Sequence, residues 1–78
     1  MAQATRDLLT TGAEKHRAGD LAAARRLYES VLAQSPDDAD ALHLLGLVEH
    51  QEGRSARGRV LIERAIALRP AEIGRAHV

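Results

Sequence analysis

The sequence repeats itself at an offset of 34 residues, and this feature constrains the fold more than any other. When the chain is shifted by 34, ten positions between residues 4 and 36 meet an identical residue. The identical pairs are Leu8 and Leu42, Gly12 and Gly46, His16 and His50, Gly19 and Gly53, Ala22 and Ala56, Arg25 and Arg59, Leu27 and Leu61, Glu29 and Glu63, Ala33 and Ala67, and Pro36 and Pro70. A period of this length predicts repeated structural units that bury their hydrophobic faces by stacking on one another.

Each half of the sequence is predicted to form two amphipathic helices joined by a tight turn. Gly19 and Gly53 suit the left-handed residue that ends the first helix of each half, and Asp20 and Ser55 suit the N-cap of the second. Pro36 then closes the first half. The composition agrees, because Ala and Leu dominate and only one aromatic residue occurs. We therefore expect an all-α protein.

The composition also excludes several kinds of protein. The 78 residues include no cysteine, so neither a disulfide framework nor a thiolate metal site is possible. Eleven basic and eleven acidic residues give no net charge to attract nucleic acid or a membrane surface. The apolar run at residues 44–48 is far too short to span a bilayer, and residues 1–7 lack the features of a secretory signal. We expect a cytoplasmic protein. No nucleophile with a base stands out, so we expect neither catalysis nor a cofactor.

The repeat resembles the tetratricopeptide repeat (TPR) family, which has small residues and a closing proline at set positions. The matching residues are Gly12, Gly19, Ala24, Tyr28 and Pro36 in the first repeat, and Leu45, Gly46, Gly53, Ala65 and Pro70 in the second. Leu8, Leu42, Lys15 and Glu49 stand where the family usually has aromatic residues, which should thin the core. The resemblance implies a right-handed stack of two repeats, at residues 5–38 and 39–72. Residues 73–78 would then start a third repeat or form a capping tail.

The resemblance further implies a non-catalytic protein-interaction module, whose first helices line a concave groove for a peptide or a partner helix. The groove positions hold Arg6, Leu9, Ala13, His16, Arg17, Asp40, His43, Leu47, His50 and Gln51. This mixed lining argues against the recognition of a C-terminal carboxylate known in some relatives, and predicts a ligand with acidic and apolar character. Three histidines in the groove predict tighter binding of an acidic peptide at pH 6 than at pH 7.5. His43 and His50 lie roughly 10 Å apart along a helix, too far for them alone to share a metal.

The last predicted helix has an apolar side that eight following residues are too few to cover. This predicted self-association face consists of Leu61, Ile62, Ala65, Ile66 and Leu68. A second copy of the chain, the remainder of a longer repeat array or a foreign helix could cover it, so we expect a homo-oligomer or part of a longer array. As an alternative, residues 42–51 resemble repeats that precede bacterial glycosyltransferase or sulfotransferase domains. That resemblance implies an N-terminal targeting or substrate-presenting segment of a larger enzyme.

Overall fold

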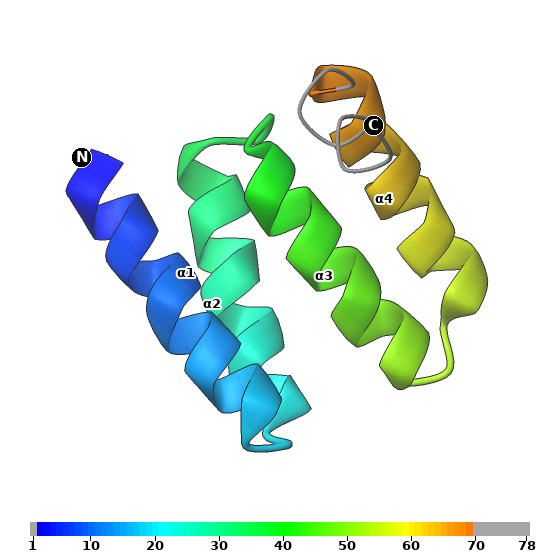
Figure 1. The fold of residues 1–78 in the computed structure, drawn as a ribbon, viewed down its shortest axis with the longest axis horizontal. Coiled ribbons are helices and arrows are strands. Elements are labelled where there is room, and N and C mark those ends of the chain that lie inside the picture. The colour runs from blue at the N-terminus through cyan, green and yellow to red at the C-terminus, as the bar shows by residue number, and fades with distance from the viewer. Residues whose placement is uncertain (1, 70–78) are drawn as a thin grey trace, which may run out of the picture.

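Four helices make up the computed structural model, which describes residues 2–69 and contains no strand within them. They are α1 (Ala2–Arg17), α2 (Leu21–Gln34), α3 (Ala39–Gln51) and α4 (Ser55–Leu68). Figure 1 shows two antiparallel hairpins, α1 with α2 and α3 with α4. Helix α3 also packs on α2 and, to a lesser extent, on α1. The predicted all-α fold of two helix pairs is confirmed, whereas the predicted role of residues 73–78 lies outside the described residues.

The turns within the hairpins form largely as the sequence predicts. Gly19 and Gly53 have φ angles of 87° and 92°, in the left-handed region that favours glycine. The Asp20 side chain caps α2 by accepting a hydrogen bond from a backbone N–H of its first turn. The prediction that Ser55 caps α4 was wrong, because Arg54 occupies the N-cap position and Ser55 is the first helical residue. The Ser55 hydroxyl lies instead 2.9 Å from Nδ1 of His50, at the end of the preceding helix.

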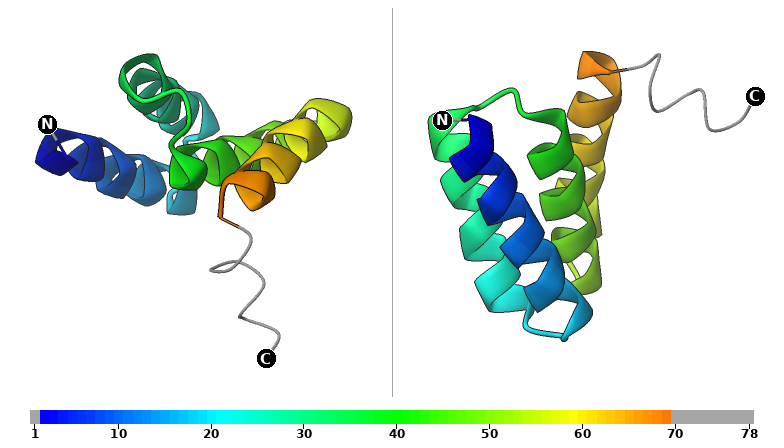
Figure 2. Two further views of the ribbon diagram at one scale, coloured as in Figure 1. Left: turned by 90° about the horizontal axis from the view of Figure 1, so that it is seen from above. Right: turned by 60° about the vertical axis from the view of Figure 1, so that its left-hand side comes forward.

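Helix α3 lies at the centre of the molecule and contributes to both parts of its core. One cluster joins Ala24 and Tyr28 of α2 to Leu45 and Val48 of α3. A second cluster consists of Ala39, Leu42 and Ala65. Figure 2 shows α1 and α3 side by side with α2 against both, so that α3 covers the face of the first hairpin. Within residues 2–69, no helix is long and apolar enough to cross a membrane.

Small residues bring the paired helices close together. A Cβ atom built on Gly12 would lie 2.5 Å from Cε1 of Tyr28. In the second hairpin, a Cβ atom built on Gly58 would lie 2.5 Å from the backbone oxygen of Gly46. The first hairpin therefore packs a glycine against an aromatic ring, and the second packs backbone against backbone.

Candidate functional site

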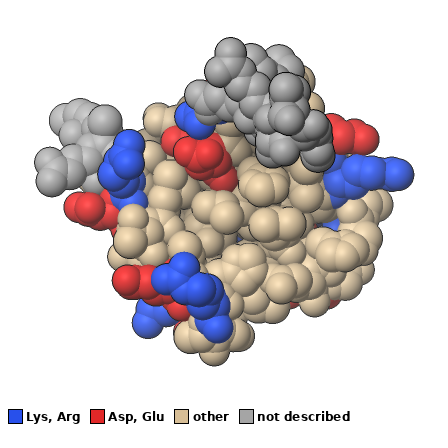
Figure 3. Space-filling model, viewed as in Figure 1, with Lys and Arg blue, Asp and Glu red and all other residues tan. Residues whose placement is uncertain are grey.

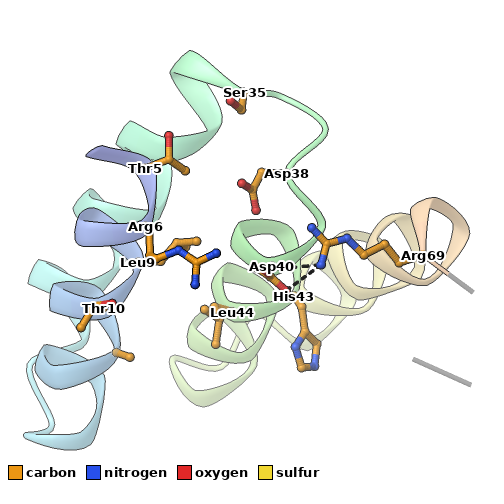
Figure 4. A pocket seen from close by; sticks show the side chains of 11 residues that line it. Thr5, Arg6, Leu9, Thr10, Ser35, Asp38, Asp40, His43, Leu44 and Arg69 are labelled. Atoms are coloured by element: carbon orange, nitrogen blue, oxygen red, sulfur yellow. Dashed lines mark hydrogen bonds and ion pairs between the residues drawn. The ribbon is translucent and has the colours of Figure 1, made fainter. Parts of the chain in front are cut away.

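A groove of about 590 Å³ lies between the N-terminal halves of α1 and α3. Leu9, Ala13 and Leu44 supply its apolar lining. Its polar lining consists of Thr5, Arg6, Thr10, Ser35, Asp38, Asp40, His43 and Arg69 (Figure 4). Figure 3 shows this side of the molecule, where uncharged residues fill much of the centre, and charged side chains lie around them and inside the upper part of the view. We call this site the α1–α3 groove.

The charged groups of the groove differ in whether they already have partners. Asp38 caps α3, since its Oδ1 atom accepts a hydrogen bond of 3.0 Å from the backbone N–H of Ala41. Asp40 forms an ion pair with Arg69 at 3.5 Å. The Arg6 side chain extends from α1 toward α3 (Figure 4) and has no ion-pair partner among the described residues. The positive charge of Arg6 is therefore available to a ligand.

Five of the ten predicted groove residues line this groove. They are Arg6, Leu9, Ala13, Asp40 and His43. His16 and Gln51 instead contact each other through Nε2 and Oε1, and join the C-terminal ends of α1 and α3. Leu47 and His50 line a different pocket, between α3 and α4, and Arg17 is exposed at the end of α1. The groove is thus confined to the first half of each helix, because the second halves are joined at their ends.

The pocket between α3 and α4 has a volume of about 440 Å³, and we call its lining the α3–α4 face. It consists of Leu47, His50, Ser55, Gly58, Arg59, Ile62, Glu63 and Ile66. Of the predicted self-association residues, Ile62 and Ile66 belong to it, and Leu68 is 44% exposed on the same helix. Leu61 packs against both core clusters and Ala65 is fully buried, so these two residues belong to the interior.

An ion cluster around the buried carboxylate of Glu49 joins α2, α3 and the start of α4. The Glu49 side chain is only 4% exposed and accepts hydrogen bonds of 3.0 and 3.1 Å from Arg54. Arg25 of α2 and Arg57 of α4 approach the same carboxylate to 3.0 and 2.8 Å. Glu52 pairs with both Arg25 and Arg54. Charged pairs therefore fill the position where the sequence predicted a thinner core.

Sequence reasoning identified neither this cluster nor the polar part of the groove contributed by chain segments outside α1 and α3. The position of Glu49 in the repeat indicated burial, but not which arginines would reach it. Arg25 lies 24 residues earlier in the chain and meets Glu49 only because α3 packs on α2. Arg69 reaches the groove in the same manner, from beyond the end of α4.

Tyr28 packs against the His16 ring. It is fully buried, and the His16 ring meets its ring edge to face at a centroid distance of 6.5 Å. Its hydroxyl has no hydrogen-bond partner among the described atoms. Burial raises the pKa of this hydroxyl, and the positive charge of Arg17 opposes that shift.

No three His, Asp or Glu side chains in the described part of the chain gather where they could hold a metal ion. No curated protein matches the chain. The family model for the tetratricopeptide repeat matches residues 15–77. That match spans α2, α3 and α4 with the end of α1, and agrees with the two helix hairpins and the 34-residue period. The chain belongs to the tetratricopeptide repeat family.

Proposed function

We propose that the chain binds a segment of a partner protein in the α1–α3 groove and has no catalytic activity of its own. Domains of this family are generally protein-interaction modules. The bound segment would place a carboxylate on Arg6 and an apolar side chain against Leu9, Ala13 and Leu44. The observation that carries this proposal is the Arg6 guanidinium, which lies beside an apolar surface and has no ion-pair partner within residues 2–69.

The expected affinity follows from the size and exposure of this groove. An exposed ion pair contributes about 1 kcal/mol or less, so Arg6 would select the ligand more than hold it. Contact with the apolar lining would supply most of the binding free energy, at about 25 cal/mol per Å² before the cost of ordering the peptide. We therefore expect weak binding that weakens further with added salt.

The test begins with peptides selected from a random library on the purified chain, whose affinities are then measured by fluorescence anisotropy. We expect the selected peptides to combine a carboxylate with a large apolar residue. Arg6→Glu should lower their affinity about tenfold, and Ala13→Gln should lower it by filling the groove. Arg26→Glu and Ala22→Gln are matched controls, because both positions are exposed on α2 and neither lines the groove. Peptides without a carboxylate, or equal effects of both variant pairs, would contradict the proposal.

The predicted pH dependence now rests on one histidine. His43 lines the groove together with Arg6, Asp38, Asp40 and Arg69, whereas the other two predicted histidines have hydrogen bonds elsewhere. Protonation of a groove histidine adds positive charge beside an acidic ligand. We expect the selected acidic peptides to bind more tightly at pH 6 than at pH 7.5, and His43→Gln to remove the difference. A difference that survives this substitution would assign the effect to another group.

A further inference from the structure

The two hairpins carry equivalent faces, and α3 covers the first of them. Ala24 and Tyr28 of α2 are fully buried and share a cluster with Leu45 and Val48 of α3. Leu32, one turn further along α2, packs against both core clusters. These contacts show how α3 packs on the surface of the first hairpin.

The corresponding face of the second hairpin keeps its apolar residues but has no helix over them in the described structure. A shift of 34 relates Ala24, Tyr28 and Leu32 to Gly58, Ile62 and Ile66, all three of which line the α3–α4 face. Ile66 is 43% exposed. Because the positions are equivalent, the second hairpin has a surface like the one on which α3 packs in the first hairpin.

The charges of the two faces indicate what such a helix would carry. Arg25 on the first face forms an ion pair with Glu49, which follows Val48 on the covering helix. The equivalent of Arg25 is Arg59, which lines the α3–α4 face and has no ion-pair partner among the described residues. Glu63 lines the same face, and its equivalent on the first hairpin, Glu29, is exposed while Arg25 pairs with Glu49. A helix that packed on the α3–α4 face as α3 packs on the first hairpin would bring a carboxylate at the Glu49 position to Arg59.

The first helix of a second copy of the chain does not fit the α3–α4 face. The shift of 34 places Thr11, Glu14 and Lys15 of α1 where α3 has Leu45, Val48 and Glu49. Two polar residues would then replace the apolar contacts, and Lys15 would meet the like charge of Arg59. The occupant is therefore a helix with a different sequence from α1.

We propose that the α3–α4 face binds an amphipathic helix of another protein, which carries apolar residues where α3 has Leu45 and Val48 and a carboxylate where α3 has Glu49. That carboxylate pairs with Arg59, and the apolar residues contact Ile62 and Ile66. This site is separate from the α1–α3 groove and does not depend on the function proposed there.

The probe for this site is a labelled, end-capped peptide with the sequence of residues 39–51, because α3 itself shows the required pattern. A second peptide carries Glu49→Lys. We expect the unmodified chain to prefer the first peptide. The Arg59→Glu chain should bind that peptide about tenfold more weakly and prefer the second. Fluorescence anisotropy measures both affinities, and circular dichroism checks that each variant keeps its helices.

Two further variants examine the apolar part of the contact. Ile66→Asp should abolish binding of the first peptide. Val60→Asp is the matched control, because Val60 is 56% exposed on the same helix but does not line the face. Arg26→Glu, on the exposed side of α2, controls for a change of net charge.

The same measurements can overturn the proposal. No saturable binding of the first peptide, or an affinity that Arg59→Glu or Ile66→Asp leaves unchanged, would remove it. A peptide that instead took the place of α3 within the fold would bind with an affinity that Arg59→Glu does not change, and this result would also contradict the proposal. Light scattering that shows a dimer of the unmodified chain, converted to monomer by Ile66→Asp, would assign the face to a second copy.

Discussion

The first and second hairpins follow one sequence template, yet equivalent residues in them have different surroundings. Leu32 packs against both core clusters, whereas its equivalent Ile66 is 43% exposed. The difference arises because α3 follows the first hairpin and packs on it. Burial in this fold is therefore set by the stack as much as by the pattern within one repeat.

The largest effect on stability is expected at the repeat position that Lys15 occupies in the first hairpin and Glu49 in the second. Glu49→Ala leaves three arginines without their shared carboxylate, and should lower the free energy of unfolding by about 2–3 kcal/mol after allowance for their partial exposure. Lys15→Ala, on exposed helix surface, should change it by less than about 0.5 kcal/mol. Urea unfolding followed by circular dichroism measures both. Equal effects would mean that the ion cluster contributes no net stability.

The second comparison tests whether the covered face is more important for stability than the open one. Leu32→Ala should destabilise the chain by about 2 kcal/mol, because Leu32 packs against both core clusters. Ile66→Ala should cost less than about 1 kcal/mol, since much of this side chain is already in water. The same unfolding measurement applies. A cost at Ile66 that equals the cost at Leu32 would indicate that the α3–α4 face is covered in solution.

The sequence predicted the parts of the fold that depend on local chemistry and on the repeat. Gly19, Gly53 and Asp20 act in the turns as their residue types suggest. The period aligns whole helices, so it identified which faces would be apolar. It did not predict the cluster around Glu49, because an ion pair between distant residues depends on how far each helix turns and tilts against its neighbour.

For the same reason, the sequence predicted only part of the candidate groove. The family resemblance placed Arg6 and Asp40 on groove-facing sides of their helices, and both line the groove. The resemblance also assigned Leu47 to the groove, but Leu47 lines the pocket with α4. Residues on one side of a helix can face different neighbours along its length, and only the packing of α1 and α4 on α3 decides which.

A smaller effect on stability is expected from adding a methyl group where two paired helices lie close together. Gly58→Ala would place a methyl group 2.5 Å from the backbone oxygen of Gly46, so the helices must separate. We expect a net loss of about 1–2 kcal/mol, since the clash exceeds the gain in helix propensity. Gly12→Ala meets the Tyr28 ring in place of backbone and should cost less. Thermal unfolding of both variants provides the comparison, and an equal or larger loss at Gly12 would contradict it.

The smallest effect appears only in alkaline solution and concerns Tyr28. Burial raises the pKa of its hydroxyl above the usual 10.0, so the folded chain holds this proton more tightly than the unfolded chain. The resulting stability is complete below about pH 10 and is lost as the pH rises through the pKa of the folded state. Because Tyr28 is the sole tyrosine, phenolate absorbance should show a later transition in the folded chain than in urea.

Moving that tyrosine to the equivalent position of the second hairpin sharpens the comparison between the two faces. In a Tyr28→Phe, Ile62→Tyr double variant, the hydroxyl lies on the α3–α4 face and should ionise closer to pH 10.0. Arg17→Ala should move the transition of the original tyrosine still higher, because it removes the charge that opposes the shift. Identical transitions for the two tyrosine positions would mean that both are equally shielded from water, and that the second face is covered as the first one is.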